Sequence, residues 1–319
     1  MTRPHTTSAS LYGVDLFGES SAPKPSGVVA GKFGYSPFSV LDARSGAWQE
    51  RKRAWLALGM RSEEGRATGL TYGMSPYGRS DRIDKLNTSI FDPVLCELAY
   101  RWFSPAGGQI VDPFAGGGVR GIVAAHTGRH YWGCDLRTEQ VTANREQAAA
   151  LCGPAMPQPV WICGDSMDTL AAAPAADFVF SCPPYGDLEV YSDDPADLST
   201  MEWHTFVAAY KRIILRAVER LRADRFACFV VGDFRDGKGF YRNFVSETIA
   251  GFEAAGARLY NEAILVTQVG SACMRVTKQF ETSRKMAKTH QNVLVFCKGD
   301  PRKAAKMGNQ NETDDGSTG

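Results

Sequence analysis

Three aspartates, Asp112, Asp135 and Asp165, each end or closely follow a short apolar run that is typical of a buried β-strand. The carboxyl ends of parallel strands meet at one edge of a sheet, so we expect these three carboxylates to lie close together. They would attract a cationic ligand that offers hydroxyl and amine donors, and they would repel a phosphate. The arrangement therefore predicts a site for a cationic nucleoside.

A glycine-rich turn follows Asp112 immediately. The sequence QIVDPFAGGGVRG spans 109–121, and its part 116–121 matches the pattern GxGxxG. Glycines there let the backbone approach a ligand closely and direct amide groups at it. By itself the pattern fits a dinucleotide or S-adenosylmethionine, and a tight turn without a ligand is the remaining alternative. The carboxylates favour S-adenosylmethionine: Asp112 would face its amino-acid part, Asp135 its ribose hydroxyls and Asp165 its adenine amine.

A second chemical signal is the sequence SCPPY at 181–185, at the end of the apolar run 178–181. Two prolines fix the backbone and remove two amide donors, which leaves carbonyl oxygens to accept hydrogen bonds. Tyr185 adds a flat ring for stacking. Together these features predict a slot for a planar group that carries an N–H, such as a base extruded from a nucleic-acid helix. The alternative is a rigid loop with Tyr185 packed in the core.

Segments that could position these residues alternate along the chain. Apolar runs predict strands at 109–112, 131–135, 160–163, 178–181, 226–231, 263–266 and 293–296. Helical periodicity predicts helices at 93–103, 119–126, 138–151, 203–221 and 241–255. This alternation is typical of an α/β fold whose mostly parallel sheet is covered by helices on both faces.

Composition excludes several other classes of protein. The chain has 319 residues and a formal net charge of +1, which argues against a protein that coats nucleic acid over its whole surface. No run approaches the roughly 18 apolar residues of a membrane-spanning helix, and the N-terminus lacks the apolar core of a secretory signal. The eight cysteines form no CxxC pair, which predicts reduced thiols in a cytoplasmic protein and no zinc site. Polar composition predicts disorder at 1–30 and in the tail 300–319.

The two motifs together resemble the signature of the DNA amino-methyltransferases, which methylate exocyclic amines of adenine (N6) or cytosine (N4). That signature is a DPF-x-G-x-G turn, here 112–118, and an Asp/Asn/Ser-Pro-Pro-aromatic turn, here 181–185. The resemblance covers 89–299, and a narrower likeness is to modification methylases of phages and prophages, which would act in the cytoplasm of a bacterial host. It implies a class I, Rossmann-like methyltransferase domain with a seven-stranded sheet, S-adenosylmethionine as cofactor, and duplex DNA with a flipped base as substrate.

The resemblance also implies roles for individual residues. The segment 88–95 is similar to the family's contact with the methionine part of the cofactor. The implied cofactor residues are Phe91, Asp92, Asp112, Pro113, Phe114, Gly116, Gly118, Asp135, Asp165 and Ser166. The implied catalytic turn is Ser181, Cys182, Pro183, Pro184 and Tyr185. No metal ligand is implied.

Cys182 departs from the family pattern, which has an oxygen acceptor directly before the two prolines. A thiol is a weak acceptor, so the carbonyl of Pro183 would take more of that task, and the usual clue that separates adenine from cytosine targets is lost. A thiolate could instead add to C6 of a pyrimidine and activate C5, although the ring-carbon cytosine methylases present Pro-Cys in the reverse order. A small buried residue without a chemical role is the third alternative.

Two basic segments could contact DNA phosphates. The segment 268–290 carries five basic residues against one acidic residue, and they are Arg275, Lys278, Arg284, Lys285 and Lys288. The other is 44–66, in the N-terminal extension 31–88, with six basic and three acidic residues. Trp48 and Trp55 stand seven residues apart in it, and that spacing favours packing onto the domain over stacking on bases. The acidic stretch 187–202 would repel a DNA backbone, so we expect it to turn away or to pair with basic residues.

Other functions fit parts of the pattern. A methylase of RNA or of a protein side-chain amide could use the same Pro-Pro-Tyr turn. A non-catalytic DNA-binding module could carry Cys182 as a mark of lost activity, but such a module would not need the glycine turn and the three carboxylates that remain. A dehydrogenase is disfavoured by Asp112 and because the sequence presents no evident hydride site.

Overall fold

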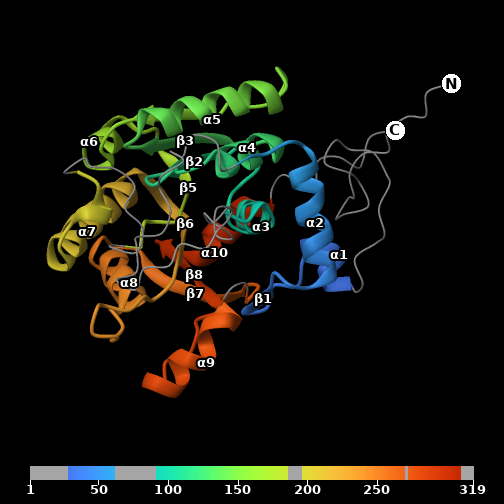
Figure 1. Ribbon diagram of the computed structural model, residues 1–319. Helices are drawn as coiled ribbons and strands as arrows, with labels where there is room; N and C mark the ends of the chain where they lie inside the picture. The colour runs from blue at the N-terminus through green and yellow to red at the C-terminus, as the bar shows by residue number, and fades with distance from the viewer. Residues whose placement is uncertain (1–27, 62–90, 186–195, 270–271, 310–319) are drawn as a thin grey trace.

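The computed structural model describes residues 28–61, 91–185, 196–269 and 272–309, in which helices flank a central sheet (Figure 1). The strands are β1 (Val40–Asp42), β2 (Gln109–Asp112), β3 (His130–Asp135), β4 (Val160–Cys163), β5 (Ala176–Ser181), β6 (Leu221–Val231), β7 (Arg258–Val266) and β8 (His290–Lys298). The helices are α1 (Val28–Phe33), α2 (Gly46–Ala57), α3 (Pro93–Phe103), α4 (Val119–His126), α5 (Thr138–Leu151), α6 (Ser166–Thr169), α7 (Trp203–Arg220), α8 (Phe244–Ala254), α9 (Ala272–Ser283) and α10 (Pro301–Asn309).

The strands follow the order β1-β7-β8-β6-β5-β2-β3-β4 across the sheet. Strand β8 is antiparallel to both of its neighbours, β6 and β7, and the other neighbouring pairs are parallel. From β2 the chain continues to β3 and β4 on one side, and then returns to β5 and β6 on the other side of β2. This is the α/β class I methyltransferase fold that the sequence predicts.

The seven predicted strands are all present, but the described residues contain an eighth, β1, which corrects the expected strand count. It comes from the N-terminal extension and pairs with β7, with Val40 opposite Ile264. Three residues are too few to display a strand alternation in the sequence. Some element ends also differ from prediction: β6 begins at Leu221, β7 begins at Arg258, and α8 begins at Phe244.

A hydrophobic core lies on each face of the sheet. One core packs α3, α4, α5 and α10 against the strands and includes Ile122 and Phe178. The other packs α6, α7 and α8 and includes Ile214 and Phe252. In α7 the buried side chains recur at 206, 210, 213, 214, 217 and 218, which is the spacing of one helical face. Strand β5 is buried at nearly every position, as a central parallel strand should be.

Helix α2 attaches the N-terminal extension to the domain. Trp48 and Trp55 are buried, as their spacing predicts, and Arg51 forms a buried ion pair with Glu97 of α3. Glu97 also accepts a hydrogen bond from Trp55 Nε1 at 2.8 Å. Because these groups are paired inside the protein, this part of the extension does not offer them to DNA. Residues 62–88 of the extension lie outside the described residues.

The two predicted disordered ends have different outcomes. Residues 1–27 and 310–319 lie outside the described residues, and 28–30 begin α1. The tail from 300 is not disordered throughout, because α10 covers Pro301–Asn309 and buries Ala304. The Asp300 side chain accepts from the amide of Arg302 at 2.7 Å and so starts this helix. The sequence did not predict this helix because its composition is mostly polar, as expected when only one narrow face is buried.

Candidate functional site

The carboxyl ends of β2, β3, β4 and β5 surround a cavity of about 140 Å³ at the point where the strand order reverses. Open α/β sheets bind ligands at such a point. A single water molecule needs roughly 10–15 Å³, so the cavity can hold part of an organic ligand. Its walls include six predicted cofactor residues and two residues of the predicted catalytic turn, namely Pro113, Phe114, Gly116, Asp135, Asp165, Ser166, Cys182 and Pro184.

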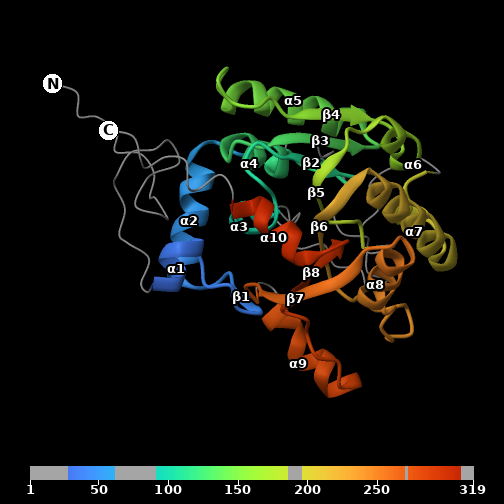
Figure 2. The ribbon, with the colours of Figure 1, turned by 180° about the vertical axis from the view of Figure 1, so that it is seen from behind.

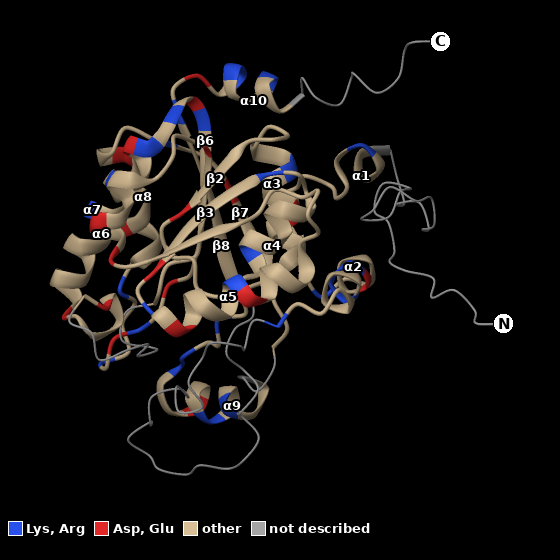
Figure 3. Cartoon of the chain, turned by 90° about the horizontal axis from the view of Figure 1, so that it is seen from above, with Lys and Arg blue, Asp and Glu red and all other residues tan. Residues whose placement is uncertain are grey.

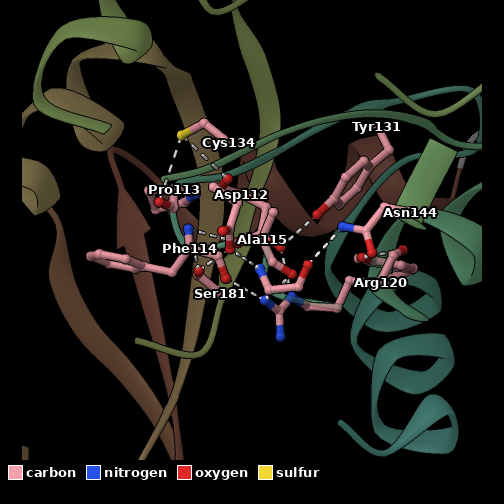
Figure 4. Close-up of polar contacts among 12 residues, drawn as sticks. Asp112, Pro113, Phe114, Ala115, Arg120, Tyr131, Cys134, Asn144 and Ser181 are labelled. Atoms are coloured by element: carbon pink, nitrogen blue, oxygen red, sulfur yellow. Dashed lines mark hydrogen bonds and ion pairs between the residues drawn. The ribbon is translucent and has the colours of Figure 1, made fainter. Parts of the chain in front are cut away.

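Asp112 does not line this cavity, which corrects the expectation that its carboxylate faces the cofactor. The side chain is fully buried, and protein donors occupy both of its oxygens (Figure 4). Oδ2 accepts from Arg120 Nε at 2.6 Å and from Tyr131 OH at 2.7 Å. Oδ1 accepts from Ser181 Oγ at 2.5 Å and from the amide of Phe114 at 3.1 Å. With four donors around it, the carboxylate is a structural group beneath the glycine turn.

Arg120 extends this network to the backbone of the turn. Its guanidinium donates to the carbonyl oxygens of Phe114 and Ala115 as well as to Asp112, and it lies over the Phe91 ring at 4.7 Å from the centroid. Burial is the largest single influence on the pKa of Arg120 and would lower it, but Asp112, Tyr131 and Cys182 together raise that pKa above its usual range. The guanidinium is therefore a permanent cation inside the core that holds the DPFA segment in one shape.

Asp135, at the end of β3, presents a carboxylate in the cavity wall. Its Oδ2 accepts from the amide of Gly116 at 3.0 Å, and its Oδ1 accepts from the amide of Arg137 at 3.0 Å. Each oxygen can accept a further hydrogen bond, so the residue fits a pair of ribose hydroxyls. Burial raises the pKa of the Asp135 carboxyl above its ordinary value, although the Arg137 and Gly116 amides act in the opposite direction.

The glycine turn is shaped for close approach. Gly116 has a φ of +48°, and its carbonyl accepts from Asn144 Nδ2 at 2.7 Å. Gly118 precedes α4 and packs against Asn144 but is not a wall of the cavity. A Cβ at Gly121 would stand 2.4 Å from Cζ2 of Trp161. The first glycine thus supplies a backbone conformation and the last one supplies close packing of helix on sheet.

Asp165 and Ser166 form the part of the wall that follows β4. Asp165 caps α6 by accepting from the amide of Met167 at 2.8 Å. Ser166 is buried and donates from Oγ to the carbonyl oxygen of Pro113 at 2.5 Å, which joins this wall to the DPF turn. Asp165 therefore remains near the cavity as the sequence predicts, and Ser166 fixes the shape of the cavity.

Phe91 and Asp92 are not among the cavity walls. Asp92 caps α3, and its carboxylate also accepts from Trp48 Nε1 at 3.3 Å and pairs with Lys52 Nζ at 3.1 Å. Phe91 packs edge-on against Phe180. Both residues are thus engaged with other parts of the protein in this structure, so the methionine contact that the resemblance implies for them has no support from the geometry.

Some residues of the SCPPY turn line the cavity and others lie outside it. Ser181 is buried and bonded to Asp112, whereas Cys182 is half-buried and lines the cavity together with Pro184. Tyr185 is half-buried outside the cavity walls, and its hydroxyl accepts from Gln291 Nε2 at 2.7 Å. Its ring meets Phe234 and Phe244 edge-on, at centroid distances of 6.4 and 6.2 Å. The turn therefore stands between the cavity and an aromatic group.

Several cavity residues were missed by sequence reasoning. Leu136 and Arg137 follow Asp135 directly, so the strand-end rule could have identified them. Ile213 of α7 and the segment 196–198 come from distant parts of the chain, and no local pattern marks them. Asp197, from the acidic stretch, is buried and accepts from the amide and hydroxyl of Ser199 at 2.9 and 2.7 Å. Residues 187–195 of that stretch lie outside the described residues.

The five basic residues proposed for DNA contact stand on or just after α9. This helix projects away from the body beyond β7 and β8 (Figures 1 and 2). Arg275, Lys278 and Arg284 are exposed, and Figure 3 shows Lys and Arg along the projecting helix. Lys285 and Lys288 are partly buried, and Lys288 lies 2.9 Å from His290 Nε2. Lys288 lies near Tyr185, because a Cβ at Gly232 would meet both side chains within 4 Å.

In the described ranges, no helix is both long and apolar enough to cross a membrane. Across the same residues, no group of three His, Cys, Asp or Glu side chains is placed to hold a metal ion.

No family model and no curated protein matches this sequence. Solved structures with a similar fold include TrmN from Thermus thermophilus, with a TM-score of 0.43 and 16% identity over 65% of this chain. The alignment spans only 48% of TrmN. Another is magnesium protoporphyrin IX methyltransferase (ChlM) from Synechocystis PCC 6803 with bound SAM, with a TM-score of 0.38 and 12% identity over 60% of this chain and 70% of that protein. A third, also from Thermus thermophilus, is a candidate DNA modification methylase, with a TM-score of 0.32 and 17% identity over 43% of this chain and 51% of that protein. The names of the last two indicate different substrates, so the shared fold does not identify the substrate.

Proposed function

We propose that this protein transfers a methyl group from S-adenosylmethionine to an exocyclic amine of adenine or cytosine in DNA. The observation that carries the proposal is that one cavity is walled both by the strand-end carboxylates Asp135 and Asp165 and by Cys182 and Pro184 of the SCPPY turn. A cofactor bound by the carboxylates would therefore lie against the turn that faces the acceptor base. The SCPPY turn follows β5, the strand next to β2, so both motifs stand at the switch point.

The residues of the cavity fit the adenosine part of the cofactor. Asp135 can accept from ribose hydroxyls and Asp165 from the adenine amine, while Phe114 supplies an aromatic wall. The cofactor, when bound, supplies an electrophilic methyl group, so the protein mainly has to position the acceptor. Asp112 and Arg120 serve this purpose indirectly, because they hold the DPFA segment and the Ser181 end of β5 together.

The acceptor side is formed by residues 182–185. Base extrusion requires a pocket with a stacking surface and acceptors for the base's N–H groups. Tyr185 is the stacking candidate, and the carbonyl of Pro183 is the acceptor candidate because the prolines contribute no amide of their own. The thiol of Cys182 lies in the same cavity wall as the cofactor carboxylates. Attack by an amine lone pair needs no strong base, and the chain is required only to orient the amine and exclude water.

The position of Cys182 also favours one second candidate, methylation at C5 of cytosine. In that reaction the thiolate adds to C6, the C5 carbon takes the methyl group, and loss of the C5 proton then expels the thiolate. Cys182→Ser separates the two reactions. For amine methylation we expect less than about a tenfold change in rate, because no bond to sulfur forms; for C5 methylation the variant should be inactive.

The substrate is tested by incubating the purified protein with tritiated S-adenosylmethionine and, separately, duplex DNA, RNA and protein. The DNA is digested and the labelled nucleoside is identified. Label on N6 of adenine or N4 of cytosine supports the proposal. Label at C5, label confined to RNA or protein, or no transfer by a protein that binds S-adenosylhomocysteine would each contradict it.

A further inference from the structure

A hairpin that sequence reasoning did not single out lies after β6, at 235–242. Its backbone is closed by hydrogen bonds from the Asp236 amide to the Phe240 carbonyl at 2.8 Å and from the Gly239 amide to the Asp236 carbonyl at 2.9 Å. Arg235 donates to the Gly239 carbonyl at 2.8 Å and lies over the Tyr241 ring, 4.0 Å from its centroid. The hairpin is therefore internally fixed, yet Phe240 at its end is 72% exposed.

The hairpin and the basic segment 284–288 form one surface. The end of β6 pairs with the start of β8, with Val231 opposite Asn292, which brings the two connections together. The Lys285 side chain crosses directly over Gly239: its Nζ would stand 2.7 Å from a Cβ at that position. Gly239 also has a φ of +94°, so the turn itself favours glycine there.

This surface borders the Tyr185 slot. A Cβ at Gly232 would stand 3.5 Å from Lys288 Cε and 3.7 Å from Tyr185 Cε1, so all three meet at the end of β6. Phe234, which precedes the hairpin, meets the Tyr185 ring edge-on. The hairpin therefore begins beside the residue on which the target base would stack.

The side chains of this surface favour the binding of a polyanion that also carries aromatic rings. The basic residues of the surface are Arg235, Lys238, Arg242, Arg284, Lys285 and Lys288. The acidic side chains within and just before it are already engaged: Asp236 accepts from the Phe240 amide at 2.9 Å, and Asp233 accepts from the Val245 amide at 3.2 Å. Phe240 and Met286 are exposed by 72% and 73%. Cations interleaved with exposed flat or apolar side chains are the arrangement that binds a nucleic-acid strand by phosphate contact and base stacking.

We propose that the hairpin 235–242 and the segment 284–288 bind the DNA strand next to the extruded base, with a neighbouring base stacked on Phe240 and with phosphates on Lys238 and Lys285. The inference rests on the proposed function for the identity of the strand as DNA. It adds to that function a second binding surface and a named stacking residue. Because Phe240 sits on a closed hairpin, it presents its ring without an ordering cost.

Binding is measured without methyl transfer, by fluorescence anisotropy of a labelled 30-base-pair DNA with the full chain and S-adenosylhomocysteine. Phe240→Ala should raise the Kd about tenfold, the usual effect of losing one base stack, and should leave the salt dependence unchanged. Phe240→Tyr should restore binding. The matched control is Phe38→Ala, because Phe38 is 70% exposed but precedes the edge strand β1.

The charge of the surface is tested by the double variant K238A/K285A. It should reduce the slope of log K against log salt by about 2, since each lysine would neutralise one phosphate. If Phe240→Ala binds as tightly as Phe38→Ala, or if the double variant keeps the full slope, the surface is not a DNA site. If RNA of the same length binds more tightly than DNA with the same dependence on Phe240, the assignment to DNA is wrong. Intact DNA binding by a protein that transfers no methyl group would overturn the proposed function but not this surface.

Discussion

At the scale of single residues, Arg120 holds the backbone of the DPFA segment, 112–115, in place. It is buried with Asp112 and bonds two carbonyl oxygens of the DPFA segment. Its removal would leave the Asp112 carboxylate buried without a cation, with only the Tyr131, Ser181 and amide donors. The pair is therefore a positioning element rather than a reacting one.

Arg120→Ala should lower the free energy of unfolding by about 3–5 kcal/mol, the usual consequence of removing one partner of a buried ion pair. Urea unfolding followed by circular dichroism measures it. The double variant D112N/R120A should recover part of the loss, because no unpaired charge then remains in the core. An Arg120→Ala protein within about 1 kcal/mol of the wild type would contradict this account of the pair.

The raised pKa of Asp135 predicts a pH dependence of cofactor binding. The ionised carboxylate accepts hydroxyl donors and the protonated form accepts them poorly, so affinity should fall as the pH falls through this pKa. Because burial raises that pKa, the decline should begin at a higher pH than for an ordinary Asp. Calorimetric titration with S-adenosylhomocysteine, from pH 8 down to the lowest pH at which the protein stays folded, measures it.

Asp135→Asn is the control for this titration. It should bind about 10- to 100-fold more weakly at pH 8, since a hydrogen bond to a charged group contributes about 1.5–3 kcal/mol. It should also show a flat pH profile over the same range. An Asn variant with the same pH profile as the wild type would show that Asp135 is not the group involved.

Some of the site could be predicted at this scale and some could not. The strand-end rule placed Asp135 and Asp165 at the cavity because it follows from local sequence alone. The rule misplaced Asp112 because the outcome depends on donors far along the chain, such as Tyr131 and Ser181. The Asp92 carboxylate likewise accepts from Trp48 and pairs with Lys52, and these contacts depend on how α2 packs against the domain.

At the scale of elements, Gly121 controls how closely α4 approaches the sheet. An Ala Cβ there would stand 2.4 Å from Trp161 Cζ2 and 3.1 Å from Tyr131 Cδ1, and both rings are buried. Gly121→Ala should destabilise the protein by about 1–3 kcal/mol through overpacking. Most of this range exceeds the roughly 1 kcal/mol that Ala usually contributes over Gly in a helix, so we expect a net loss of stability.

Gly31→Ala is the matched helical control, because a Cβ at Gly31 meets nothing within 4 Å. Thermal or urea unfolding should show this variant to be equal to or more stable than the wild type. Equal stability of the Gly121→Ala variant and the wild type would indicate that α4 does not need the close approach seen here.

The periodic elements were the most predictable, since buried strands and the apolar face of α7 leave strong local patterns. Short elements and elements that are mostly exposed to solvent were not predictable from the sequence. Strand β1 has three residues, and α10 buries only one narrow face. The hairpin 235–242 has turn residues but no apolar alternation, so its position beside Tyr185 became visible only through the pairing of β6 with β8.

At the scale of the whole molecule, the net charge of +1 is a sum of unlike regions. Acidic groups such as Asp177 are paired internally, with Arg222 at 2.6 Å and Arg225 at 3.1 Å, near the amino ends of β5 and β6. Exposed cations stand instead on and just after α9, which extends from the sheet (Figure 3). A protein of nearly zero net charge can therefore still present a local basic surface.

The central claim is methylation of DNA at an amine, and its most direct test is nucleoside mass spectrometry of DNA from cells that express the protein. The host should lack DNA methylation of its own, and Asp135→Ala serves as the binding-deficient control. We predict N6-methyldeoxyadenosine or N4-methyldeoxycytidine with the wild-type protein and neither with the variant. Wild-type protein that binds S-adenosylhomocysteine but leaves the DNA without either nucleoside would contradict the account.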